Sequence, residues 1–233
     1  MKLPGRVPAV TAVVFGVTAT TSVLQFVFPA MLVALRRDPQ GLHGEWWRTF
    51  TALFVQDGGP VGTISNLAFL LVIGTLAEQV LSTRRWLICY FGAGVAGELA
   101  GYVWQPQGAG NSVGICGLAG ALIVALLLSD ERMPRVAPMF LMYWCGALLG
   151  LLFWPGIVLG VAGAVLAQIA GGRGLPVGRP VAMAAAVVAA VLLAARDIHG
   201  AALVAGMAIA ALIARADRPD PYAVGVRPPE PSS

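Results

Sequence analysis

Long apolar runs separated by short polar connections dominate the chain. A helix crosses a bilayer in roughly 17–25 residues, so this pattern predicts about eight membrane-spanning helices. The run 136–171 is too long for one crossing and is divided at Trp154-Pro155-Gly156, because proline lacks a backbone donor and glycine favours a turn. A polar connection occupies 36–60. The predicted spans are 8–35, 61–81, 86–104, 112–129, 136–153, 155–171, 180–196 and 199–215.

The composition agrees with a membrane protein. Of the 233 residues, 58% are hydrophobic and only 11% are charged, whereas soluble domains carry about 25% charged residues. We therefore expect an all-α, polytopic membrane protein with one transmembrane domain over 1–215. The Pro-rich, charged segment 216–233 is expected to be a disordered tail.

The positions of the basic residues predict the orientation. The net charge of +4 does not indicate nucleic-acid binding, because the basic residues form no stripe or block. With the N-terminus inside, eleven basic residues fall on the inner side, and four (Arg36, Arg37, Arg48 and Arg196) fall on the outer side. Cytoplasmic loops are enriched in Lys and Arg, so both termini are predicted to be cytoplasmic, in the cell membrane.

Two polar residues begin apolar spans on the same predicted side. Ser112 precedes the run 115–128, and His199 precedes the run 201–214. The break at Trp154-Pro155-Gly156 places both on the outer face, so the serine could serve as a nucleophile and the histidine as its base. Ser112 could equally cap its helix or bond a neighbouring helix, and His199 could be an interfacial cap.

Small residues on both spans favour close approach of the two helices. Gly110, Gly114, Gly117 and Gly120 lie on or near one face of the first, and the second offers Ala202, Ala205 and Gly206. Small faces let helix backbones approach each other. Such packing would bring Ser112 and His199 together, but it would also occur in a protein without catalysis.

Four further polar residues need an explanation. Asn66 could donate to an oxyanion or bond a neighbouring helix. Asp197 is interpreted as a loop or cap residue, since residues two apart do not share a helix face. Glu78 is expected to pair with Arg84 or Arg85 or to cap the inner loop. Glu98 is a functional candidate as an acid within the membrane, and the sequence indicates no partner for it.

Together these residues resemble the rhomboid family of intramembrane serine proteases. The likeness is best over 46–128 and 197–210, and it rests on motifs in the family's order. They are Trp47-Arg48, Asn66, Gly74 with Glu78, Gly110-Asn111-Ser112 before the Gly-rich stretch 117–121, and His199 before Ala202 and Gly206.

The resemblance implies a six-helix core, here with about two extra helices, and an endopeptidase that cuts in or near a transmembrane segment. Ser112 would be the nucleophile and His199 the base, with Asn66 and Gly110 supporting the oxyanion. The partners would be a transmembrane protein substrate and the lipid bilayer, with no nucleic acid, metal or cofactor.

The chain departs from the family pattern at three points. Val113 follows the serine where the family has glycine, and Gly62 stands where the family has a histidine four residues before the asparagine. Three spans, rather than one, separate the serine helix from the histidine helix. These departures leave two alternatives open, an inactive rhomboid-like protein that binds membrane clients and, less favoured, a small transporter.

Overall fold

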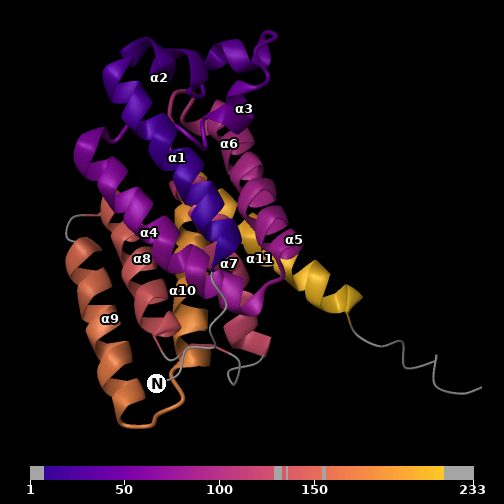
Figure 1. Cartoon of the computed structure of the whole chain (residues 1–233). Helices are drawn as coiled ribbons and strands as arrows, with labels where there is room; N and C mark the ends of the chain where they lie inside the picture. Colours follow the sequence, from indigo (N-terminus) through magenta and orange to yellow (C-terminus); the bar gives the residue numbers. More distant parts are fainter. Residues whose placement is uncertain (1–7, 129–132, 135, 154–155, 218–233) are drawn as a thin grey trace, which may run out of the picture.

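The fold was analysed in a computed structural model, which describes residues 8–128, 133–134, 136–153 and 156–217. Of the tail predicted over 216–233, residues 218–233 lie outside the described part, as do the break residues Trp154 and Pro155. Within it the chain is helical, and its one extended pairing is an isolated bridge between Arg37 and Gly108. The helices form a bundle, with α2 and α3 near one end and the α9–α10 turn at the other (Figure 1).

The helices follow the predicted spans closely after residue 36. In chain order, the elements are α1 (Ala9–Val27), α2 (Pro29–Leu35), η1 (Pro39–Leu42), α3 (Arg48–Thr51), α4 (Gly59–Val80), α5 (Thr83–Leu87), η2 (Ile88–Gly92), α6 (Ala93–Trp104), α7 (Ser112–Leu128), α8 (Ala137–Leu152), α9 (Gly156–Gly172), α10 (Gly178–Ala194) and α11 (Ile198–Ala216). η2 is a π-helical turn that continues α5 into α6, so these three elements make one membrane-length helix.

The predicted first span, 8–35, is wrong as a single helix. α1 ends at Val27, and α2 begins with Pro29 at its first turn. Proline cannot donate a backbone hydrogen bond, so it tolerates the first turn of a helix but not the interior. The Phe28-Pro29 pair therefore ends the membrane helix earlier than hydropathy alone indicates.

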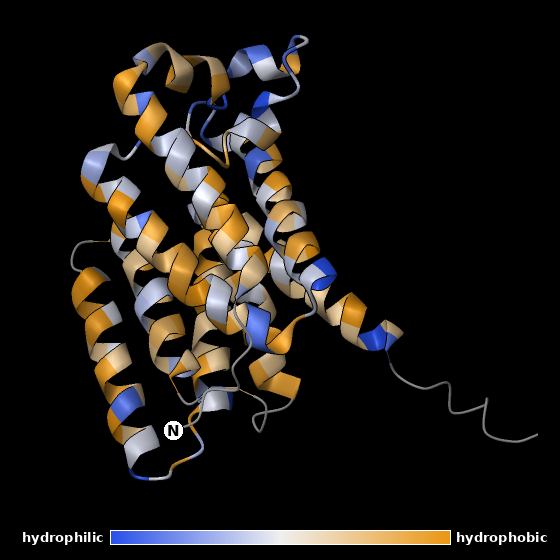
Figure 2. Cartoon of the chain, in the orientation of Figure 1, coloured by the Kyte–Doolittle hydropathy of each residue, from blue (hydrophilic) through white to orange (hydrophobic). Residues whose placement is uncertain are grey.

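The apolar surface fits a multi-pass membrane protein. Among the described residues, four helical stretches of at least 18 residues are long and apolar enough to cross a membrane: Ala9–Val27, Gly59–Val80, Thr83–Trp104 and Ile198–Ala216. The other four apolar helices are slightly shorter. Many large hydrophobic side chains of these helices are exposed, and the most hydrophilic residues lie mainly near the two ends of the bundle (Figure 2). A lipid environment explains these exposed apolar faces, which would be unfavourable in water.

α7 is the central helix of the bundle. Nearly all of its residues are buried, and α4, α6, α10 and α11 pack around it. α9 packs mainly on α8 at the edge of the bundle (Figure 1). A helix that is hydrophobic all round belongs in such an interior position. The nucleophile candidate Ser112, at the start of α7, is thus mounted on the most enclosed helix.

Glycines bring α7 and α11 into close contact. A Cβ atom on Gly206 would overlap the backbone of Gly117, and one on Gly120 would overlap the backbone of Leu203. The predicted small-residue packing of these two helices therefore occurs. Gly114 does not take part, because the space beside it is filled by the Tyr90 ring of η2.

Glu78 fastens α1 to α4. Its carboxylate accepts hydrogen bonds from the backbone N–H groups of Val10 and Thr11, at 3.1 and 3.0 Å, and from the Thr11 hydroxyl at 2.8 Å. The first N–H groups of a helix lack intrahelical acceptors, so the carboxylate satisfies the start of α1. The expected pairing with Arg84 or Arg85 is wrong, and Arg85 instead contacts Asp217.

Candidate active site

Ser112 and His199 meet at one end of the bundle. Ser112 is the first residue of α7, and His199 is the second residue of α11. The Ser112 Oγ and His199 Nε2 atoms lie 3.0 Å apart, and both residues are partly buried. This distance is within reach of proton transfer between a nucleophile and its base.

Asp197 contacts the imidazole of His199, in addition to serving as the cap residue that the sequence predicted. It is the N-cap of α11, and its Oδ1 atom accepts from the His199 backbone N–H at 2.8 Å. The same oxygen lies 2.8 Å from His199 Nδ1. Because Asp197 has extended backbone angles (φ −89°, ψ 135°), it lies outside the helix. The rule that residues two apart in a helix lie on different faces therefore does not apply to it. Asp197 is thus both a cap and an orienting residue.

The Asp197 contact determines which nitrogen of His199 is free to act as a base. Burial alone would raise the pKa of the Asp197 carboxyl, but hydrogen bonds and charge attraction from His199 lower that pKa below its ordinary value. An ionised carboxylate only accepts hydrogen bonds, so Nδ1 carries the proton. Nε2 then has a lone pair directed at the Ser112 hydroxyl, as general-base catalysis requires.

A buried ion pair holds the loop that leads to Ser112. Arg37 and Glu98 form a salt bridge, with side chains 1% and 0% exposed. The Arg37 guanidinium also donates to the backbone oxygen of Gln105, at 2.7 and 3.1 Å, and the Arg37 backbone pairs with Gly108. Arg37 is therefore the partner that the sequence could not identify for Glu98. Through Arg37 the pair anchors both ends of segment 105–108, just before Ser112.

Asn66 belongs to a buried carboxamide network beside Ser112. Its Nδ2 atom donates to Gln56 Oε1 at 2.8 Å, and Gln56 Nε2 donates to Asn111 Oδ1 at 3.0 Å. A Cβ atom on Gly110 would lie 3.2 Å from Ser112 Oγ, 3.5 Å from Asn66 Nδ2 and 3.6 Å from Gln56 Oε1. The absence of a side chain at Gly110 keeps this polar space beside Ser112 open. The sequence did not predict that Gln56 and Asn111 take part in this network, since neither lies in an amphipathic pattern.

The two unusual residues near the site have different consequences. The Val113 side chain is 1% exposed and fills the space beside Gly97 of α6, where a Cβ would meet it at 2.5 Å. It packs between helices, so valine is compatible with the position after the serine. A Cβ atom placed on Gly62 would have no atom within 4 Å apart from those of Gly62 and of its neighbours in the helix. Gly62 therefore has no side chain with which to donate a hydrogen bond to the site.

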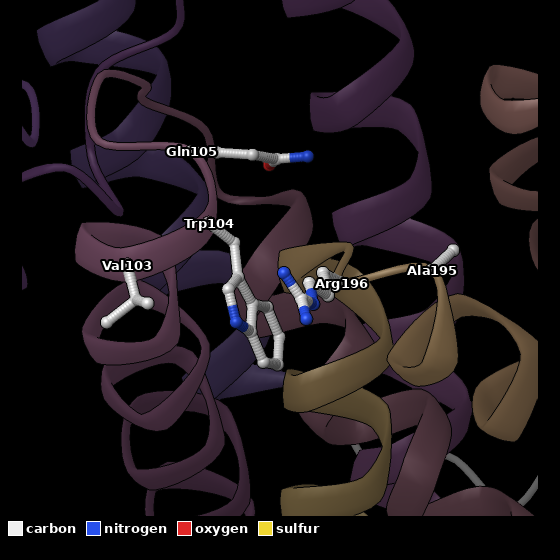
Figure 3. A pocket seen from close by; sticks show the side chains of 5 residues that line it. All are labelled: Val103, Trp104, Gln105, Ala195 and Arg196. Carbon is white, nitrogen blue, oxygen red and sulfur yellow. The ribbon is translucent and has the colours of Figure 1, made fainter.

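A separate cleft of about 620 Å³ borders the turn that carries Asp197. It is lined by Val103, Trp104, Gln105, Ala195 and Arg196, and the Trp104 and Arg196 side chains point toward each other in it (Figure 3). Arg196 has φ 59°, the left-handed conformation common just after a helix end. Neither Ser112 nor His199 lines this cleft.

The chain matches a known protein family. The family model described as the Rhomboid domain matches residues 43–172, more than half of the chain and including Ser112. The chain belongs to the rhomboid family. The matched region ends before His199, so the assignment of the histidine depends on the contact with Ser112.

Two relatives come from Bacillus subtilis (strain 168). Rhomboid protease GluP is 36% identical over 96 residues, which cover 39% of this chain and 18% of that protein. Putative rhomboid protease YdcA is 31% identical over 117 residues, covering 46% of this chain and 58% of that protein. The chain thus spans less than two thirds of either relative. No solved structure matches it.

Proposed function

We propose that this rhomboid protein is an intramembrane serine endopeptidase that cleaves a peptide bond in or near a transmembrane segment of another protein. The observation that carries this proposal is the linked arrangement of Ser112, His199 and Asp197, with 3.0 Å between Oγ and Nε2 and 2.8 Å between Nδ1 and Oδ1. A nucleophile, a base and a residue that orients the base are the parts of a serine hydrolase.

The reaction follows from these contacts. Ser112 Oγ attacks the substrate carbonyl carbon while His199 Nε2 takes the hydroxyl proton, and the carbonyl π electrons move to the oxygen. The oxyanion forms near Gly110, where the Ser112 backbone N–H and the second N–H of Asn66 can stabilise it. His199 then protonates the departing amine, and the C–N bond breaks to leave an acyl ester on Ser112.

Water completes the cycle. His199 takes a proton from a water molecule, whose oxygen attacks the ester carbonyl and forms a second oxyanion at the same position. When this oxyanion collapses, the ester C–O bond breaks, and His199 returns the proton to Ser112 Oγ. The carboxyl product leaves, and the enzyme is restored. The site lies at the helix ends rather than at the bundle centre, so water can reach it.

Labelling with a fluorophosphonate tests the proposal. The purified protein should form a covalent adduct with Ser112, because the reagent phosphonylates a serine activated by a base. The adduct should be absent in Ser112→Ala and present in Ser65→Ala, in which the replaced serine is exposed on α4. Mass spectrometry would locate the label. No adduct in the wild-type protein would contradict an active dyad.

A second candidate function is supported by Gly62, which has no side chain to donate at the oxyanion position. The protein would then bind membrane clients without cleaving them. Losing an oxyanion donor costs about 10²–10³ in rate in other enzymes, which is a reduction and not an abolition. An unlabelled wild-type protein that still binds transmembrane clients would favour this alternative.

We also propose that the protein lies in the plasma membrane with both termini in the cytoplasm. The support is the excess of basic residues in the sequence segments that are predicted to lie on the side opposite Ser112. A phosphatase that is active only outside the cytoplasm should be silent when fused after Ser233 and active when fused after Gln107, beyond the end of α6. The reverse activities would overturn the orientation and place Ser112 on the cytoplasmic side.

A further inference from the structure

Gln56 is a buried residue that joins three segments of the site, although it lies in the connection between α3 and α4. Its backbone N–H donates to Gln25 Oε1 at 2.8 Å, and its backbone oxygen accepts from Gln25 Nε2 at 2.6 Å. Gln56 is 1% exposed and Gln25 is 4% exposed. These two hydrogen bonds to the Gln25 side chain fix the Gln56 backbone against α1.

The Gln56 side chain bridges two asparagines on opposite sides of it. Its Oε1 atom accepts from Asn66 of α4, and its Nε2 atom donates to Asn111, which immediately precedes Ser112. A carboxamide has one acceptor oxygen and two N–H donors. Because one Asn66 N–H is committed to Gln56, the plane of the Asn66 amide is restrained, and its second N–H remains available.

The available donor borders the space beside the nucleophile. A Cβ atom placed on Gly110 would lie 3.2 Å from Ser112 Oγ and 3.5 Å from Asn66 Nδ2. Gly62, one turn before Asn66 on α4, has no atom within 4 Å of its own Cβ position. The side-chain donor at this space therefore comes from Asn66, and its orientation depends on Gln56.

We infer that Gln56 is a positioning residue for catalysis, which holds Asn66 so that its second N–H meets the developing oxyanion. This inference rests on the proposed proteolytic function. The side-chain hydrogen bonds of Gln56 in the described part of the chain go to Asn66 and Asn111, so Gln56 acts through Asn66, although its Oε1 atom also lies 3.6 Å from the Gly110 Cβ position. Its restraint matters because the χ2 angle of an asparagine otherwise varies over a broad range, and a shift of 1 Å in a positioned group can cost about 10²-fold in rate.

Gln56→Met tests this role, since methionine has a similar length and no comparable hydrogen-bonding group. We expect kcat for a transmembrane model substrate to fall about 10- to 10²-fold, with little change in KM. In an Asn66→Ala background the same substitution should change kcat hardly at all, because the residue that Gln56 positions is gone. Thr63→Val is the matched control, because it likewise removes a buried polar group, here one on α4 whose hydroxyl bonds the Gly59 carbonyl and not Gln56.

A conservative variant separates positioning from folding. In Gln56→Glu, a protonated carboxyl can accept from Asn66 and donate to Asn111, so this variant should retain more activity than Gln56→Met. If Gln56→Met lowers the melting temperature in detergent, the comparison is made with Gln56→Glu at a temperature where both are folded. Equal activities of the two folded variants would overturn the inference.

The outcomes also distinguish this inference from the proposed function. Unchanged kcat in Gln56→Met, with Ser112→Ala inactive, would overturn the role of Gln56 and leave proteolysis intact. Additive losses in the Gln56→Met/Asn66→Ala double variant would overturn it as well, because Gln56 would then act by another route. A wild-type protein that neither cleaves the substrate nor reacts with fluorophosphonate would overturn both proposals.

Discussion

Ser112→Ala and His199→Ala are each expected to reduce cleavage of a tagged transmembrane substrate by about 10⁴- to 10⁶-fold, and the double variant should be no worse than the poorer single one. A nucleophile and its base act as a unit, so their losses do not add. Both side chains lie at helix beginnings and are partly buried, so truncation opens little space. The melting temperature in detergent should therefore change modestly.

The chain provides matched controls for both substitutions. His43 is the other of the two histidines and is exposed, and Ser65 is an exposed serine near Asn66. His43→Ala and Ser65→Ala should keep wild-type rates. Full activity in folded Ser112→Ala would exclude this serine as the nucleophile, and multiplied losses in the double variant would show that the two residues act independently.

The Ser112–His199 contact could be predicted from the sequence because it depends on two simple patterns. The count of membrane spans places both residues on one face, and the glycines of α7 and α11 allow the backbones to approach. The close packing of Gly117 against Gly206 is the structural result of that second pattern. Periodicity along a helix was enough here, since both partners are helical.

Residues in connections could not be predicted in the same way. Gln56 and Asn111 are paired through contacts between segments 55 residues apart in sequence, and no periodicity encodes such a pairing. The same holds for Arg37 and Glu98, which are separated by 61 residues. These contacts depend on the irregular backbone of the segments between the helices. The pattern of hydrophobic residues does not predict the path of such segments.

Two features that were not predicted, the early end of the first membrane helix and the contact of Asp197 with the imidazole, had signals in the sequence. Pro29 marks the end of the first membrane helix, because a proline inside a helical pattern usually ends or kinks it. Asp197 two residues before a histidine fits an N-cap, whose side chain folds back over the first turn of its own helix. The capping interpretation was right, and the same geometry also brings the carboxylate to Nδ1.

Asp197→Asn should lower kcat by about 10³- to 10⁴-fold while leaving the protein folded. In a serine protease triad, the corresponding change costs about 10⁴ because the imidazole takes the wrong tautomer. Asparagine caps a helix about as well as aspartate, so the hydrogen bond from the His199 backbone N–H can be kept. The loss should therefore appear in kcat for the model substrate, with little change in KM or melting temperature.

A comparison of two substitutions separates the two roles of Asp197. Asp197→Ala removes the cap as well as the charge. It should lose about as much activity as Asp197→Asn and, in addition, lower the free energy of unfolding by about 0.5–2 kcal/mol. Asp217→Asn serves as the control, because Asp217 is an exposed acid at the far end of α11, where it contacts Arg85. If Asp197→Asn retained wild-type kcat, Asp197 would be only a helix cap, and Ser112 and His199 would act as a dyad without a carboxylate.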